Sequence, residues 1–168
     1  KNIFITTLLF LTVVFCSAQE KYVPSQENLT NREWFRDAKF GMFIHWGIYS
    51  MLAEANGADQ QKPERGGVQK LADGFYPSKF NADEWVRIAK DAGMKYICFT
   101  SRHHDGFSMF DTKQSDYNIV KATPFKRDVI KELAEACQKH GLKLFFYYSH
   151  IDWHRPDYYP WGRTGRNT

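Results

Sequence analysis

Residues that could bind a ligand follow or end three short apolar runs of the chain. The first run ends at His45 and Trp46, the second is followed by His103 and His104, and the third contains Tyr147 near its end. Imidazole and phenol groups donate and accept hydrogen bonds with hydroxyl groups, and aromatic rings cover the C–H face of a sugar. Because few acids accompany them, these residues predict a site for a neutral, polyhydroxylated ligand.

Metal binding is the alternative use of the same residues. His45, His103 and His104 offer nitrogen ligands, and His150 and Asp152 follow the third run. Adjacent side chains on an extended segment point in opposite directions, which separates His103 from His104. The sequence also has neither a His-x-His pair nor a His-Glu-x-x-His motif. A sugar site is therefore the favoured interpretation, with a metal-assisted barrel hydrolase as the alternative, and no cofactor is expected.

The apolar runs alternate with amphipathic segments. Residues 40–45, 96–100 and 142–148 are typical of buried strands. One helix is predicted to begin at Asn81, with Glu84 three residues later as in a capping box, and to end near Gly93; another runs from Asp128 to Gly141. The residues expected to face the sheet are Trp85, Ile88 and Ala89 in the first helix and Ile130, Leu133, Ala134 and Cys137 in the second.

This alternation predicts the α/β fold class, with a parallel sheet and helices packed on it. In such folds, ligands bind where the carboxyl ends of the strands meet. The three candidate groups of residues lie at those ends, so we expect them to form one shared site.

The first 18 residues have the pattern of a secretory signal peptide. A charged start at Lys1 precedes an apolar run, and the small residues Ser17 and Ala18 predict cleavage after Ala18. A buried N-terminal strand or helix is the alternative. Residues 19–30 form a polar lead-in, and Thr30 or Asn31 is expected to cap a short helix. The protein is therefore expected to be secreted or periplasmic.

Composition excludes several classes of protein. The chain has 168 residues, of which 43% are hydrophobic and 25% charged, which argues against a largely disordered protein. Apolar runs of 18 or more residues, as needed to span a membrane, do not occur. The net charge of +4 is too small and too dispersed to indicate a nucleic-acid partner. Cys98 and Cys137 are expected to be core thiols.

Several ordered motifs within residues 31–168 resemble the family 29 glycoside hydrolases, the α-L-fucosidases. The matching motifs are Phe-Gly-Met-Phe-Ile-His-Trp-Gly at 40–47, Ser-Arg-His-His-Asp-Gly-Phe at 101–107, Asp-Tyr-Asn at 116–118, Lys-Arg-Asp at 126–128 and Phe-Tyr-Tyr-Ser at 146–149. The resemblance implies a (β/α)8 TIM-type barrel that releases L-fucose from fucosylated oligosaccharides or glycoconjugates with retention of configuration. It says nothing about oligomeric state or linkage specificity.

The resemblance also implies roles for the site residues. His45, His103, His104 and Tyr147 are expected to hydrogen-bond the hydroxyl groups of fucose. Trp46 is expected either to form a wall of the sugar pocket or to pack in the core beneath the barrel mouth.

The carboxyl groups needed for hydrolysis are not identified in this sequence. Retaining hydrolysis uses two carboxyl groups about 5–5.5 Å apart, and the resemblance places the nucleophile after a fourth strand. We therefore expect both the nucleophile and the acid/base beyond Thr168, the last residue of the sequence. Asp105, Asp111 and Asp152 do not match the nucleophile motif, and Asp105 is expected to brace the double-histidine loop.

The three strand-like runs predict an incomplete barrel of about three strands and their helices, since a full barrel needs about 250 residues. Without the two carboxyl groups it is expected to be inactive by itself. A non-catalytic fucose-binding remnant with the same fold is the alternative.

Residues 53–70 depart from the resemblance. The family has Glu-Trp in this region, whereas this Gly- and Gln-rich stretch has no Trp. A divergent exposed loop and a local frameshift over residues 58–70 are the two interpretations. Glu54 is a weak substitute for the missing glutamate.

Overall fold

The computed structural model describes residues 22–52 and 71–155. The chain divides into two units, residues 1–37 and 38–168, which are described separately. None of the described helices is long and apolar enough to cross a membrane.

Three expectations fall outside the described residues. They concern the signal peptide at residues 1–18, the divergent stretch 53–70 with Glu54, and the end of the chain at Thr168. The location of the nucleophile and the acid/base beyond Thr168 therefore stays a prediction, as do the other two.

Helix α2, Gln26–Ala38, belongs to the first unit except for its last residue. The prediction that Thr30 or Asn31 caps this helix is wrong, because the helix begins earlier. The Ser25 hydroxyl accepts a hydrogen bond from the backbone N–H of Asn28 at 3.2 Å, as an N-cap residue does. The Thr30 hydroxyl instead donates to the Gln26 carbonyl at 3.0 Å, a bond typical of a threonine inside a helix.

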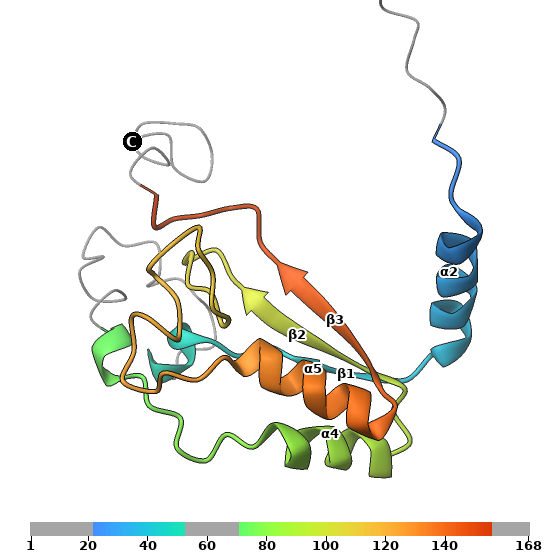
Figure 1. Cartoon of the computed structure of the whole chain (residues 1–168), viewed down its shortest axis with the longest axis horizontal. Helices are drawn as coiled ribbons and strands as arrows, with labels where there is room; N and C mark the ends of the chain where they lie inside the picture. Colours follow the sequence, from blue (N-terminus) through green and yellow to red (C-terminus); the bar gives the residue numbers. More distant parts are fainter. Residues whose placement is uncertain (1–21, 53–70, 156–168) are drawn as a thin grey trace, which may run out of the picture. The chain divides into compact units, whose positions relative to one another are not determined.

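Three parallel strands form the sheet of the second unit, in the order β1-β2-β3. They are β1 (Gly41–Ile44), β2 (Tyr96–Arg102) and β3 (Lys143–Tyr148). Their carboxyl ends point toward the same edge, where the loops gather (Figure 1). The predicted parallel sheet of three strands is confirmed.

Helices α4 (Ala82–Asp91) and α5 (Val129–His140) lie side by side on one face of this sheet (Figure 1). The Asn81 side chain caps α4 by accepting the Glu84 backbone N–H at 3.2 Å, as predicted. Asp128 caps α5 in the same way, and Gly141 ends it in the left-handed conformation, with φ of 75°. The capping residues near each helix end therefore predicted both helix starts correctly.

The buried faces of the helices were predicted only in part. Ala89, Leu133 and Cys137 are buried as expected, but Ile88 is 51% exposed and Ala134 is also exposed. The buried residues are Ala82, Val86 and Ala89 in α4 and Val129, Leu133, Ala136 and Cys137 in α5. Each helix packs against its neighbour as well as the sheet, so the buried stripe is rotated relative to one that faces the sheet alone.

The two faces of the sheet differ in burial. Ile97 and Phe99 of β2 face the helices and are fully buried. On the other face, Phe43 is 58% exposed and Cys98 is half-buried. Cys98 is therefore not the core thiol that was predicted, whereas Cys137 is. The core of this unit lies between the sheet and its two helices.

Candidate functional site

Four predicted site residues meet at the carboxyl ends of the strands, around the ring of His103. The ring centroids of His45 and His104 lie 4.9 and 4.5 Å from it, and the Tyr147 ring stacks on it at 5.6 Å. We call His45, His103, His104 and Tyr147, with Tyr49 described below, the ring cluster. The expected convergence of the strand ends is confirmed.

The strands place these side chains. His45 follows β1 directly, the two histidines follow β2, and Tyr147 lies in β3 opposite Thr100. The Thr100 hydroxyl donates to the carbonyl of Ile44, 56 positions away in the chain, at 3.1 Å. This bond ties the end of β1 to β2 and helps to hold the rings in contact.

Tyr49 is a member of the cluster that the sequence analysis missed. Its ring lies 5.0 Å from His45 and 5.2 Å from His103. A side chain at Gly47 would meet the Tyr49 ring at 2.7 Å, so glycine leaves room for this packing. Burial raises the pKa of the Tyr49 phenol above its usual value, so the group stays protonated. Its spacing of four residues from His45, across a turn, was the available signal.

His103 is neutral at physiological pH. Burial lowers the pKa of its imidazole to about 4, with contributions from the neighbouring His104 and His45. Its Nδ1 atom is buried and makes no hydrogen bond with any described residue. A neutral imidazole has one donor and one acceptor, which suits a ligand that carries hydroxyl groups.

His104 is held by the segment that follows β3. Its Nδ1 lies 2.5 Å from the Ser149 hydroxyl, and its backbone carbonyl accepts from the Trp153 N–H at 2.7 Å. The Trp153 ring lies 5.2 Å from the His104 ring. Ser149 and Trp153, which both follow the third strand, thus hold His104 in place.

Arg102 joins the same two segments. Its Nε donates to the Gly106 carbonyl at 3.1 Å, and its terminal nitrogens reach the Tyr148 hydroxyl at 3.2 Å and the Asp152 carboxylate at 2.5 Å. The ion pair is largely buried. We call Arg102, Gly106, Tyr148 and Asp152 the Arg102 clasp. It holds the double-histidine loop against the segment after β3.

Asp105, Asp111 and Asp152 each take part in local contacts. Asp105 braces the double-histidine loop as predicted, because its Oδ1 accepts the Phe107 N–H at 3.0 Å. Burial raises the pKa of Asp105 to about 7. Asp152 belongs to the clasp, and the exposed Asp111 lies beside Asp128, to whose carboxylate its backbone N–H donates at 3.0 Å.

Trp46 takes a different position from the ring cluster. Its ring packs on Phe75, Phe80, Trp85 and Phe99, with centroids 5.4–6.1 Å apart. Neighbouring side chains at a strand end point to opposite faces, so His45 and Trp46 separate. This favours the core-packing interpretation of Trp46, and its contact with a sugar stays a prediction.

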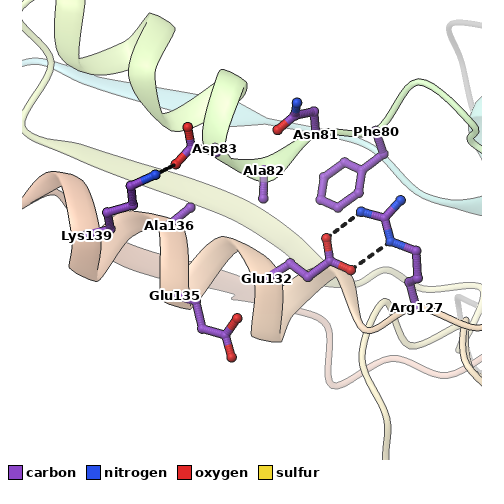
Figure 2. Close-up of a pocket in the computed structure, with 9 residues that line it drawn as sticks. All are labelled: Phe80, Asn81, Ala82, Asp83, Arg127, Glu132, Glu135, Ala136 and Lys139. Carbon is purple, nitrogen blue, oxygen red and sulfur yellow. Dashed lines mark hydrogen bonds and ion pairs between the residues drawn. The ribbon is translucent and has the colours of Figure 1, made fainter.

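A cleft of about 480 Å³ lies away from the strand ends, between α4 and α5 (Figure 2). Four of its charged groups form two ion pairs, Arg127 with Glu132 and Lys139 with Asp83, at 2.5 and 2.6 Å. The Lys139–Asp83 pair links α5 to α4, so we interpret this cleft as part of the helix packing and the strand ends as the better candidate site. Among residues 22–52 and 71–155, there is no group of three or more His, Cys, Asp or Glu that could hold a metal ion.

Comparisons with known proteins agree with this geometry. The family model for alpha-L-fucosidase matches residues 9–168. A putative alpha-L-fucosidase of Caenorhabditis elegans is 33% identical over 90% of this chain and 35% of its own length. The human plasma alpha-L-fucosidase is 33% identical over 81% of this chain and 34% of its own length. The chain thus spans about a third of these curated relatives.

Solved structures give the same result. Alpha-L-fucosidase AlfC from Lactobacillus casei, in complex with the alpha-L-fucose product, has 48% identity and a TM-score of 0.69, over 75% of this chain and 43% of that one. Isoenzyme 1 from Paenibacillus thiaminolyticus has 42% identity and a TM-score of 0.71, over 79% of this chain and 31% of that one. The three parallel strands are accordingly part of a fucosidase barrel. The ring cluster at the strand ends is consistent with the family model, the curated relatives and the solved structures. The chain belongs to the alpha-L-fucosidase family.

Proposed function

We propose that this chain supplies the sugar-binding half of the active site of a retaining α-L-fucosidase. The observation that carries the proposal is the ring cluster, which gathers three imidazoles and two phenols at the carboxyl ends of three parallel strands. The likeness to an enzyme solved with alpha-L-fucose supports the choice of sugar. We propose in addition that the chain belongs to glycoside hydrolase family 29 and that the whole protein acts on fucosylated oligosaccharides or glycoconjugates.

The chemistry of the cluster fits the recognition of a neutral sugar. Each sugar hydroxyl can donate one hydrogen bond and accept others, and so can each neutral imidazole or phenol. Hydrogen bonds that strengthen as positive charge develops on the sugar ring stabilise the transition state more than the bound substrate. His45, His103, His104 and Tyr147 are therefore proposed to orient fucose and to contribute to catalysis through positioning.

The two catalytic carboxyl groups are proposed to come from a part of the protein beyond Thr168. Asp105 is buried beneath its loop, and Asp152 is paired with Arg102 at 2.5 Å. To act as a nucleophile, Asp105 would have to give up its hydrogen bond to the Phe107 N–H, and Asp152 its ion pair with Arg102. Both contacts hold the loops that carry the histidines. The same observation favours a second candidate function, a fucose-binding remnant without turnover, in a protein that lacks those carboxyl groups.

Hydrolysis of an aryl α-L-fucoside by the complete protein tests the proposal. We expect turnover, with the α-anomer of fucose as the first product seen by NMR. His45→Ala and His104→Ala should each lower kcat/KM by about 100-fold, the scale of lost positioning. Lys139→Ala, in the cleft of Figure 2, is the control and should leave it unchanged.

The outcomes separate the candidates. Fucose binding without turnover would favour the remnant. Activity that is lost on treatment with a chelator would favour metal-assisted hydrolysis. Unchanged kinetics in both histidine variants would overturn the assignment of the site.

We also propose that the protein is secreted or periplasmic, supported by the charged, apolar and small-residue order of residues 1–18. Expression of the gene in a bacterial host with N-terminal sequencing of the product tests this. Processed protein should begin at Gln19, whereas an intact N-terminus in a cytoplasmic product would contradict the proposal.

A further inference from the structure

Ser149 has an unusually complete set of hydrogen bonds. Its hydroxyl accepts the Ile151 N–H at 3.0 Å, lies 2.9 Å from the Ile151 carbonyl and lies 2.5 Å from Nδ1 of His104. The residue is 4% exposed, and its own N–H donates to the Arg102 carbonyl at 3.0 Å. It is therefore fixed to both β2 and the segment that follows β3.

Counting protons at this hydroxyl identifies the protonation of the histidine. A serine hydroxyl has one proton to donate and two lone pairs with which to accept. The Ile151 carbonyl can only accept, so it takes the hydroxyl proton. The remaining lone pair then faces Nδ1 of His104, which must carry a proton for a hydrogen bond to form.

We propose that Ser149 is a positioning residue that holds His104 with its proton on Nδ1. In the neutral ring, Nε2 then has a lone pair that can accept a hydrogen bond from a hydroxyl group of the sugar. This inference rests on the proposed function for its ligand, but the position of the proton is a property of the free protein. Ser149 acts through His104 and does not itself contact the sugar.

The protonation is measured directly by NMR. The complete protein is labelled with ¹⁵N-histidine, and long-range ¹H–¹⁵N correlations report which ring nitrogen carries a proton. His104→Gln identifies the His104 signals. At pH 7.5 we expect a protonated Nδ1 and an unprotonated Nε2 in the wild type, without any ligand. A proton on Nε2 would overturn the proposal.

Kinetics test the consequence of this positioning. Ser149→Ala should lower kcat/KM for an aryl α-L-fucoside by about tenfold, the equivalent of one hydrogen bond. Ser149→Thr keeps the hydroxyl and should restore the protonated Nδ1 and most of the activity. Ser115 is the matched control, because its hydroxyl accepts the N–H of Tyr117, two residues on, at 3.1 Å but contacts no site histidine. Ser115→Ala should retain wild-type activity.

Failure of the two proposals can be distinguished. A protonated Nδ1 in a protein that neither binds nor cleaves fucosides upholds the role of Ser149 and removes the proposed substrate. An active enzyme whose Ser149→Ala variant keeps both the wild-type protonation of His104 and its kcat/KM overturns the role of Ser149. Near-UV circular dichroism confirms that each variant is folded. The wild-type NMR spectrum, assigned with His104→Gln, decides the protonation of His104 without any Ser149 variant.

Discussion

Two titratable residues of one loop, the partly buried His103 and the buried Asp105, respond to pH in opposite directions. The pKa of Asp105 is raised to about 7, so between about pH 4 and 7 the folded state keeps a proton that the unfolded state releases. Stability therefore falls as pH rises through this window. The pKa of His103 is lowered to about 4, so below about pH 6.5 the unfolded state binds a proton that the folded state does not, and stability falls as pH falls.

The Asp105→Asn variant separates the contribution of Asp105 to the pH dependence of stability from that of His103. The variant lacks the carboxyl group whose ionisation opposes folding, so its stability relative to the wild type should rise by at least about 1 kcal/mol from pH 4 to pH 7. Urea unfolding of both proteins at several pH values measures the difference. A difference that stays constant with pH would show that Asp105 ionises normally in the folded state.

Gly106 offers a second test at the level of single residues. It has a φ of 77°, and an added Cβ would meet the Asp152 carboxylate and His154, so Gly106→Ala should open the Arg102 clasp. Gly93 is the matched control, with a φ of 81° and open space around its Cβ position. Gly93→Ala should cost only the backbone strain, about 1–2 kcal/mol.

Thermal unfolding and fucoside hydrolysis distinguish the two glycine variants. Gly106→Ala should be less stable than Gly93→Ala and should lose activity, because the double-histidine loop shifts. Equal stability and activity in the two variants would contradict a tight fit between Gly106 and the segment after β3.

At the scale of elements, the Arg102 clasp connects the ends of β2 and β3. Arg102→Lys keeps the charge but cannot reproduce three hydrogen bonds made in different directions, so kcat/KM should fall by about tenfold or more. Arg127→Lys is the control, since Arg127 makes a two-bond ion pair with Glu132 in the cleft between the helices (Figure 2). A similar loss in both variants would indicate a general effect of replacing arginine.

The elements were predictable where the signal is local. Asn81, Asp128 and Gly141 cap their helices through groups within a few residues, so sequence patterns identified these ends. The exposure of Ile88 and Ala134 was not predictable, because it depends on how two helices pack together. The start of α2 was missed because Ser25 competes with Thr30 as a cap, and both are good cap residues.

The candidate site was also predictable only in part. Polar residues after parallel strands meet at one edge, so His45, His103, His104 and Tyr147 could be grouped from their positions alone. Tyr49 lies in the 3-10 helix Ile48–Leu52, and its approach to His103 depends on a turn whose geometry the sequence does not reveal. The Arg102 clasp likewise joins residues 50 positions apart.

At the scale of the whole molecule, the described sheet has one covered and one open face. Phe43 is 58% exposed on the open face, and Phe146 of the edge strand β3, on the same face as Phe99, is 51% exposed. Exposed apolar surface of this kind favours aggregation unless other residues cover it. The isolated segment 19–168 is therefore expected to be poorly soluble or molten.

Spectroscopy of that segment tests the expectation. It should bind a hydrophobic dye, show weak near-UV circular dichroism and unfold over a broad temperature range. A sharp, cooperative transition with a strong near-UV signal would show that these residues fold without further partners.

A crystal structure of the complete protein with L-fucose tests most directly whether the ring cluster binds this sugar. We expect one sugar at the carboxyl ends of the strands, with its hydroxyl groups in hydrogen-bond contact with His45, His103, His104 and Tyr147. Fucose bound elsewhere, with the ring cluster occupied only by solvent, would contradict it.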